Sequence, residues 1–446
     1  MTPYATRRAR LIAHMHTKGG GVAIIATAPE VARNSDADYP YRHDSSFYYL
    51  TGFTEPEAVL VLVAGAHNQS ILFCRDKNPE REIWDGYRYG PAAAREAFNF
   101  DAAHPIDQLD TVLPTLLADA PAVFYALGHS AALDAQIQSW LAKVRAQVRS
   151  GVIAPTTAHD LIGPLHEMRL VKDSSETDIM RRAAKISAAA HARAMQIAAP
   201  GLHEYELDAE LLHGFRKHGS DFPAYTSIVA TGANACVLHY RAGASVLQQG
   251  DLVLIDAGCE LDGYASDITR TFPASGKFSD AQKTLYEIVL NAQRAAFDAT
   301  GPGKRFMDGH DAAVRVLAQG MLDTGLLAAD KVGTLDDVIA NGDYRQFYMH
   351  RTGHWLGMDV HDVGGYHEPD SVADAKGVKP SRILHPGMTL TVEPGLYVRP
   401  SPGVPEQFWH IGIRIEDDVV VTDTGIDILS RDAPKTIAEI ESVMAR

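Results

Sequence analysis

Four acidic residues and one histidine in the second half of this 446-residue chain have the residue types of a metal site. They are Asp256 in LVLIDAG, Asp267 in ASDITRTF, His354 in HRTGHWLG, Glu393 in TVEPG and Glu416 in IRIEDD. Each acid lies in or beside a β-prone segment, where an unpaired carboxylate is costly to bury. Burying four together is worse, because like charges at short range force one another to protonate. Two divalent ions would balance the four charges, and oxygen ligands with one imidazole suit Mn²⁺, Co²⁺ or Zn²⁺.

Two of the segments that carry these acids share one pattern. GDLVLIDAG and GMTLTVEPG each place a turn glycine, a β-run, an acid and a second glycine at the same spacing, and a further acid follows each, Asp267 or Glu416. The repeat predicts two related hairpins that give two carboxylates each to a shared centre. If the first hairpin turns near Asp262, Asp256 and Asp267 face each other with Cβ atoms roughly 4.5–5.5 Å apart. A slip of one residue would turn one acid away.

The elements that must position these residues follow from the pattern along the chain. The first part alternates β-runs with helical segments, which favours a three-layer α/β domain. Its predicted strands are GVAIIATA, AVLVLVAG, SILFCR and AVFYALG, and its predicted helices are AAAREAF and ALDAQIQSWLAKVRAQV. In LHEMRLVKDSSE, Asp173 has the N-cap chemistry of a helix that ends at Pro200. We therefore place the domains at residues 1–173 and 174–446, and expect a short surface helix within 433–446.

Composition and charge exclude several classes of protein. An apolar share of 46% with 22% charged residues is typical of a soluble globular chain. The net charge of −15, without a long Lys/Arg run, argues against nucleic acid or a membrane as partner. Cys74, Cys236 and Cys259 lack zinc-finger or CxxC spacing, as expected in a reducing compartment. No stretch approaches the ~20 apolar residues of a membrane span, so we expect a cytoplasmic protein.

The five acid and histidine motifs resemble, in the same order, the ligand motifs of the "pita-bread" metallopeptidases. This family includes methionine aminopeptidase, prolidase and aminopeptidase P. The resemblance implies an α+β pita-bread catalytic domain, with two related halves around a curved antiparallel sheet. It also implies two divalent ions, with Mn²⁺ expected first and Co²⁺ or Zn²⁺ as alternatives. Asp267 and Glu416 would bridge both ions, Asp256 would bind one, and His354 with Glu393 would bind the other.

The first half of the chain resembles the creatinase-like α/β N-terminal domain of aminopeptidase P. The similarity is clearest in HDSSFYYLTGFTEPEAVLVL and EIWDGYRYG. It implies a metal-dependent aminopeptidase that hydrolyses the N-terminal Xaa-Pro bond of peptides through a hydroxide held by two ions. It also implies a homo-oligomer, a dimer or a tetramer, in which Trp84 reaches a neighbouring subunit's site. Prolidase, which keeps a comparable front domain and cleaves Xaa-Pro dipeptides, is the nearest alternative.

Three histidines outside the ligand set match positions of the same family. The resemblance assigns His361, in DVHDVG, to the scissile carbonyl or the tetrahedral intermediate. It places His350, in YMHRTGH, and His239, in CVLHYR, in the substrate pocket. An arbitrary histidine is more often a surface or core residue, and the position within these motifs is what favours function here.

Two further residues near the acids have expected roles. Glu393 is expected to move the proton from the attacking water to the leaving nitrogen, because a metal-bound carboxylate lies within reach of both. Arg414 shares the strand parity of Glu416 and could orient a ligand carboxylate, a contact that metal sites often need. A surface salt bridge is the alternative for Arg414.

Two other functions compete with the peptidase. A pita-bread module could bind peptides without catalysis, but relatives of that type have usually lost metal ligands, whereas all five are present in this chain. A metal-free, creatinase-like amidinohydrolase is disfavoured by the same intact set.

Overall fold

The computed structural model describes residues 2–375 and 377–445, and it divides into two compact units, Met1–Arg169 and Leu170–Arg446. Unit 1 is an α/β domain, and unit 2 is an α+β domain that contains all the candidate site residues. Among the described residues, no helix is both long enough and apolar enough to cross a bilayer.

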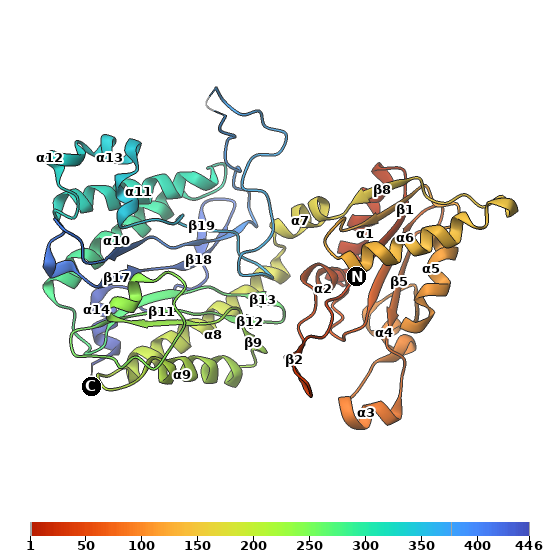
Figure 1. Cartoon of the computed structure of the whole chain (residues 1–446), viewed down its shortest axis with the longest axis horizontal. Helices are drawn as coiled ribbons and strands as arrows, with labels where there is room; N and C mark the ends of the chain where they lie inside the picture. The colour runs from red at the N-terminus through yellow and green to blue at the C-terminus, as the bar shows by residue number, and fades with distance from the viewer. Residues whose placement is uncertain (1, 376, 446) are drawn as a thin grey trace. The chain divides into compact units, whose positions relative to one another are not determined.

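Unit 1 is built on a six-stranded mixed sheet with the strand order β6-β5-β4-β1-β7-β8 (Figure 1). Its central strand β1 (Gly21–Ala26) pairs antiparallel with β4 (Val59–Ala64) and parallel with β7 (Ala122–Tyr125). The other strands are β2 (Ala32–Asn34), β3 (Ala37–Asp38), β5 (Gln69–Cys74), β6 (Ala102–Pro105) and β8 (Thr157–Asp160). The helices are α1 (Pro3–Thr17), α2 (Ser45–Thr51), α3 (Pro79–Asp85), α4 (Gly90–Phe98), α5 (Leu109–Leu117), α6 (Ala131–Arg145) and α7 (Ile162–Leu170).

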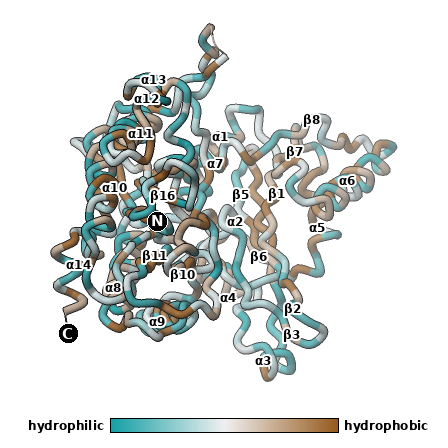
Figure 2. The backbone as a smooth tube through the Cα atoms, turned by 60° about the vertical axis from the view of Figure 1, so that its left-hand side comes forward, coloured by the Kyte–Doolittle hydropathy of each residue, from teal (hydrophilic) through white to brown (hydrophobic). Residues whose placement is uncertain are grey.

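Both faces of this sheet are covered, as expected for strands that are apolar along their whole length. Val22 and Ile24 of β1 pack with residues of α5 and α6 on one face. On the other face Leu60 and Leu62 of β4 are fully buried, and α1 packs against the same strand. Figure 2 shows these strands as hydrophobic segments between the more polar helices. The four strands predicted here and the three-layer arrangement are confirmed.

Unit 2 consists of two helix pairs packed on antiparallel strands (Figure 1). The helices are α8 (Ser174–Ile197), α9 (Glu204–Lys217), α10 (Asp280–Ala299), α11 (Phe306–Asp323), α12 (Ala329–Val332), α13 (Leu335–Asn341) and α14 (Ile437–Val443). The first-half strands are β9 (Phe222–Pro223), β10 (Ile228–Thr231), β11 (Leu252–Asp256), β12 (Cys259–Leu261), β13 (Tyr264–Ala265) and β14 (Thr269–Pro273). The second-half strands are β15 (Thr389–Val392), β16 (Gly395–Val398), β17 (Ile411–Arg414), β18 (Asp417–Val421) and β19 (Ile426–Ile428).

The helix that opens unit 2 begins where the sequence places it. The side chain of Asp173 accepts a hydrogen bond from the N–H of Glu176, and the carboxylate of Glu176 accepts one from the N–H of Asp173. This reciprocal capping box satisfies two of the free N–H groups at the start of α8. Because unit 2 begins at Leu170, the residues just before this cap belong to the same compact unit as the candidate site residues.

The two predicted hairpins are present, with one difference in register. In the first, Leu261 pairs with Tyr264 around a turn at Asp262 and Gly263, as predicted. However, Asp256 pairs with Thr269, so the expectation that Asp256 faces Asp267 directly is wrong. Asp267 lies two residues before Thr269, in a diagonal position.

In the second hairpin, Val392 pairs with Asp417 and Gly395 pairs with Arg414. The same register places Glu393 opposite Glu416. The two halves therefore hold their second acids at different levels of the hairpin, which the spacing of the repeat alone does not determine.

The second glycine of each repeat allows the strands of its hairpin to come close together. A Cβ on Gly258 would lie 1.7 Å from the carbonyl oxygen of Ser266, and a Cβ on Gly395 would lie 2.8 Å from that of Ile413. No other residue fits at such a distance. The glycine after each acid thus has the same steric cause in both halves, which supports the repeat.

Candidate metal centre

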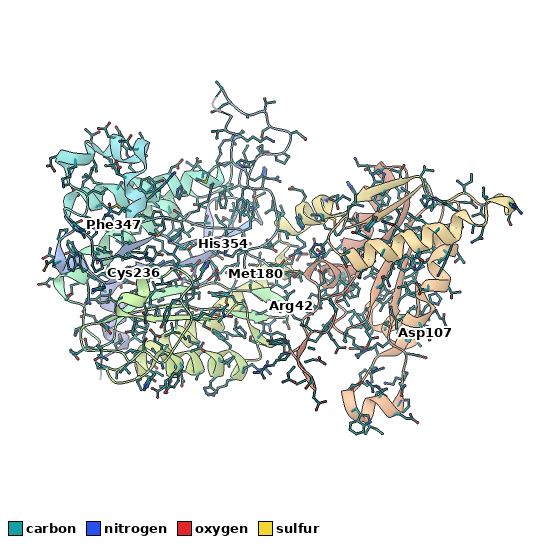
Figure 3. The ribbon with its side chains drawn as sticks, in the orientation of Figure 1. Arg42, Asp107, Met180, Cys236, Phe347 and His354 are labelled. Carbon is teal, nitrogen blue, oxygen red and sulfur yellow. The ribbon has the colours of Figure 1, made fainter. Side chains whose placement is uncertain are left out.

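One cavity of about 990 Å³ in unit 2 brings together every residue that the sequence singles out for chemistry. His354 is one of its lining residues and is buried within unit 2 (Figure 3). The cavity is lined by Asp256, Asp267, His354, Glu393 and Glu416 and by His239, His350, His361 and Arg414.

The five predicted ligands lie close together. Asp267, His354 and Glu416 each offer a donor atom, and the three atoms lie within 4.8 Å of one another. Nε2 of His354 is 3.4 Å from Oδ2 of Asp267 and 3.8 Å from Oε1 of Glu393. Asp256 is joined to Asp267 through one shared hydrogen-bond donor, described below.

The backbone sets His354 in the orientation that a metal ligand needs. Its Nδ1 lies 3.0 Å from the carbonyl oxygen of Trp355, which can only accept a hydrogen bond. Nδ1 therefore carries a proton, and Nε2 faces Asp267 and Glu393, where its lone pair would be available to a metal ion once Nε2 is deprotonated. Without an ion, these two carboxylates outweigh the effect of burial and raise the pKa of His354 to about 9. The ring thus occupies a position where positive charge is stabilised.

The acids have too little positive charge around them to be ionised together. Burial raises the pKa of Glu393 to about 7, with further contributions from Asp267 and Asp256. Burial, followed by the charge of Asp267, raises the pKa of Glu416 well above its ordinary value. The pKa of Asp267 is raised by burial and by Asp256. Bound cations would reverse these shifts, so the donor set fits divalent metal.

Arg414 is 4% exposed and contacts the predicted ligands from inside the protein, so a surface salt bridge is excluded. Its Nη2 donates to Oδ2 of Asp256 at 2.5 Å, and its Nε donates to the hydroxyl of Thr269 at 3.1 Å. The hydroxyl of Thr269 in turn donates to Oε2 of Glu416 at 2.6 Å. One guanidinium therefore orients carboxylates from both hairpins.

Tyr225 is a site residue that the sequence reasoning missed. Its hydroxyl lies 2.5 Å from Oδ1 of both Asp256 and Asp267. A hydroxyl has one proton and can donate to one of these oxygens at a time. Tyr225 lies in PAYTS, before β10, and neither its spacing nor its type distinguishes it from other tyrosines in the chain. Only the folded arrangement brings it between the two acids.

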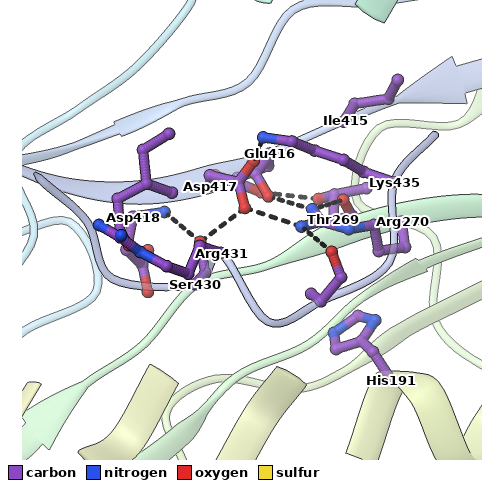
Figure 4. Close-up of polar contacts among 12 residues, drawn as sticks. His191, Thr269, Arg270, Ile415, Glu416, Asp417, Asp418, Ser430, Arg431 and Lys435 are labelled. Atoms are coloured by element: carbon purple, nitrogen blue, oxygen red, sulfur yellow. Dashed lines mark hydrogen bonds and ion pairs between the residues drawn. The ribbon is translucent and has the colours of Figure 1, made fainter. Parts of the chain in front are cut away.

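A second buried charge cluster lies directly behind Glu416 (Figure 4). Nη1 of Arg270 donates to the carbonyl oxygens of Thr269 and Glu416, and Nη2 donates to Oδ1 of Asp417 at 2.7 Å. Nζ of Lys435 lies 2.7 Å from the other oxygen of Asp417. Arg270 of this cluster thus holds the backbone carbonyl of the predicted ligand Glu416 and does not bond its carboxylate.

The remaining histidines line the cavity around the ligands. The ring of His361 stacks on that of His354, with 3.8 Å between centroids and 9° between planes. Nδ1 of His350 lies 2.7 Å from the carbonyl oxygen of Arg351, so its Nε2 accepts from the hydroxyl of Tyr397 at 2.8 Å. His239 is exposed on the cavity wall. All three lie where a bound peptide could contact them.

Comparison with known proteins gives the family of this arrangement. Residues 178–423 match the model for "Metallopeptidase family M24", and residues 4–125 match that for "Aminopeptidase P, N-terminal domain". The Xaa-Pro aminopeptidase of Escherichia coli is 44% identical over 99% of this chain and 97% of its own length. The structure of Pseudomonas aeruginosa aminopeptidase PepP matches with a TM-score of 0.94 at 49% identity, covering 99% of this chain and 97% of that one. Zinc-substituted E. coli aminopeptidase P in complex with product matches with a TM-score of 0.92 at 44% identity over the same shares.

A pita-bread domain whose cavity brings four carboxylates together with the imidazole of His354 defines a metal-dependent hydrolase. The chain belongs to metallopeptidase family M24, with the N-terminal domain of the aminopeptidase P type. The resemblance noted in the sequence is thereby confirmed.

Proposed function

We propose that this protein is an Xaa-Pro aminopeptidase that releases the N-terminal residue from peptides with proline in the second position. The observation that carries the proposal is the convergence of five donor residues on one cavity within a chain of this family. The similarity to Xaa-Pro aminopeptidases over nearly the whole chain supports the substrate class.

We further propose that Asp256, Asp267, His354, Glu393 and Glu416 hold two divalent ions, with Mn²⁺ preferred. When bound, the ions supply Lewis acidity to the scissile carbonyl and to the attacking water. The chain's own groups do the rest. Glu393 takes a proton from the water and passes it to the leaving nitrogen, because an amide nitrogen leaves poorly unless it is protonated.

The histidines and Arg414 orient the reactants in this proposal. His361 donates a hydrogen bond to the oxygen of the scissile carbonyl, where negative charge develops. His350 and His239 contact the peptide from the cavity wall. Arg414, held against Asp256 and Thr269, fixes the carboxylates and contributes to the substrate pocket.

We also propose a homo-oligomer, a dimer or a tetramer. The support is on α3 of unit 1 and just after it: Ile83 and Trp84 of α3 are 82% and 83% exposed, and Tyr87, two residues after α3 ends, is 66% exposed. Clustered exposed apolar residues are typical of interaction sites. Sedimentation of the protein and of a Trp84→Ser variant tests this, and a monomeric wild-type protein would contradict it.

The cellular assignments are proposals of the same kind. A cytoplasmic location is supported by three buried cysteines that are free thiols. The net charge of −15 supports the expectation that neither nucleic acid nor an anionic membrane is a partner.

The decisive experiment compares three peptides with Mn²⁺ added. Alanyl-prolyl-leucine should be hydrolysed to alanine and prolyl-leucine, whereas alanyl-alanyl-leucine should not. A chelator should abolish the activity, and added Mn²⁺ should restore it. Hydrolysis of alanyl-proline but not of the proline tripeptide would indicate prolidase. Metal analysis showing about zero ion per chain, with no hydrolysis, would indicate a binding module.

A further inference from the structure

Lys172 and Asp362 form a deeply buried ion pair outside the ligand set of unit 2. Nζ of Lys172 lies 2.8 Å from Oδ2 of Asp362, and each side chain is 1% exposed. Charges at this depth lose most of their hydration, and replacing a buried pair by apolar residues is often neutral or stabilising. A contribution to global stability is therefore a weak explanation for this ion pair. Its position next to His361 suggests a role in the candidate active site instead.

Asp362 is the residue after His361, in the segment 357–364 that forms part of the cavity wall. Its N–H donates to the carbonyl oxygen of Trp355 at 2.8 Å. Its carboxylate lies against Gly357, where a Cβ would be 2.0 Å from Oδ2. The segment is thus folded tightly around this carboxylate, and the place of His361 depends on where the carboxylate is held.

Lys172 is itself tied to the strand that leads to the ligand Glu393. Its N–H donates to the carbonyl oxygen of Gly387 at 2.9 Å, and Val171 forms a bridge with Met388, directly before β15. Lys172 therefore connects the strand that leads to Glu393 with the segment that carries His361.

The contact between the rings of His361 and His354 leaves the backbone of His361 undetermined. Stacking fixes the plane of the ring, but a histidine side chain can rotate about two bonds. The side chain of His361 is also exposed in the cavity. The ammonium of Lys172, acting through the next residue, supplies the constraint that stacking does not.

We propose that Lys172 and Asp362 are positioning residues that set His361 against the carbonyl of the scissile bond. This inference rests on the role of His361 in the proposed function. A displaced His361 would lose a hydrogen bond that strengthens in the transition state, while the metal ligands would stay in place. Displacement by about 1 Å can lower a rate ~100-fold. The loss should appear in kcat and in kcat/KM alike, with KM little changed.

The test is a double-mutant cycle with the variant Lys172→Met/Asp362→Asn, which removes both charges at similar size. We expect kcat on alanyl-prolyl-leucine to fall ~100-fold, with bound Mn²⁺ per chain unchanged. In a His361→Ala background, the same pair of substitutions should cause no further loss, because residues that act through one another are not additive. If the double variant does not fold, Asp362→Asn alone, which keeps the side-chain shape, goes through the same cycle.

The matched control is Lys277→Met/Glu441→Gln. That pair has a similar Nζ–Oε2 distance of 2.7 Å, but Lys277 is 73% exposed. The control should leave kcat and metal content unchanged. Additive losses in the His361→Ala background, or losses of metal content that account for the activity, would overturn the positioning role. A wild-type protein that is inactive on the tripeptide would instead overturn the proposed function, and that result needs no variant.

Discussion

Glu416 and Asp417 are consecutive residues and both are fully buried, but Asp417 is surrounded by cations and hydrogen-bond donors, whereas Glu416 is surrounded mainly by other acids. Asp417 accepts hydrogen bonds from Arg270 and Lys435, and also from Ser430 and Gln293. Burial raises the pKa of its carboxyl, but the two cations and the hydrogen bonds outweigh burial and hold that pKa below its ordinary value.

Glu416 faces the other side, where its neighbours are mainly other acids. It accepts a hydrogen bond from the hydroxyl of Thr269. Burial and the charge of Asp267 raise its pKa well above the ordinary value, and Arg414 offsets this only in part.

The contrast shows how one buried run of acids serves two purposes. Around Asp417 the protein supplies its own cations, so the cluster is complete and structural. Around Glu416 the protein supplies acids and leaves the balancing charge to a ligand. Buried negative charge that the protein's own cations do not balance is therefore what distinguishes the candidate metal site from the structural cluster.

The largest expected effect is that of Glu416→Gln on metal binding. Because this substitution removes a proposed bridging ligand, Mn²⁺ affinity should fall by more than ~100-fold, the upper range for loss of a surrounding hydrogen bond. The melting temperature in chelator should stay the same or rise, because glutamine resembles the neutral acid that the raised pKa of Glu416 favours and cannot ionise. Calorimetric titration and thermal melts measure the two effects. Unchanged Mn²⁺ affinity would remove Glu416 from the ligand set.

Asp417→Asn should have the opposite profile. The substitution leaves Arg270 and Lys435 with an unmatched buried charge, so the free energy of unfolding should fall by about 3–5 kcal/mol. Urea denaturation of chelator-treated protein measures this loss. A loss below about 1 kcal/mol is typical of an exposed ion pair. Such a result would mean that the cluster around Asp417 does not stabilise the fold.

His191 sharpens the comparison, because it is a buried base that stays neutral behind the same acids. Its Nε2 lies 2.9 Å from the carbonyl oxygen of Ala257, and burial, aided by the charge of Arg270, lowers its pKa from 6.5 to about 4. Below pH 6.5 the unfolded chain therefore binds a proton that the folded chain does not. Its contribution is full above pH 6.5 and is lost as the pH falls towards 4, by up to about 3 kcal/mol.

The measurement is the free energy of unfolding in chelator between pH 4 and 6.5, for wild type and His191→Gln. Glutamine can still donate to the carbonyl oxygen of Ala257 but does not titrate. The slope of stability against pH should be smaller in the variant. Parallel slopes would mean that other groups cause the acid sensitivity.

The acids themselves could be predicted from sequence because local patterns carry them. A glycine, a β-run and an acid recur at fixed spacing, and Gly258 and Gly395 have the same steric cause in both hairpins. The apolar strands of unit 1 could be predicted for a similar reason, because strands buried on both faces are continuous hydrophobic runs. Local sequence patterns therefore predicted the acidic site residues and the buried strands.

Residues that act across the fold could not be found in this way. Tyr225 reaches Asp256 and Asp267 only after β10 and β11 pair, and Lys172 meets Asp362 across 190 positions of sequence. The register of the first hairpin follows from its turn: pairing of Leu261 with Tyr264 places Thr269, and not Asp267, opposite Asp256. The contacts of Tyr225 and Lys172 depend instead on tertiary packing, which a single sequence does not encode locally.

The smallest expected effect tests whether the two neighbouring regions are independent. Lys435 is 21% exposed and donates to Oδ2 of Asp417, whereas Arg270 donates to Oδ1. Lys435 also donates to Oε1 of Gln293 at 3.3 Å. Lys435→Met should therefore lower the free energy of unfolding by about 1 kcal/mol, as for a partly exposed pair. Because Arg270 still holds the backbone of Glu416, Mn²⁺ affinity should change by less than the ~10-fold that loss of a ligand-supporting contact costs. A larger fall in affinity would mean that the cations around Asp417 also tune the metal ligands, and that the structural cluster and the site are one electrostatic unit.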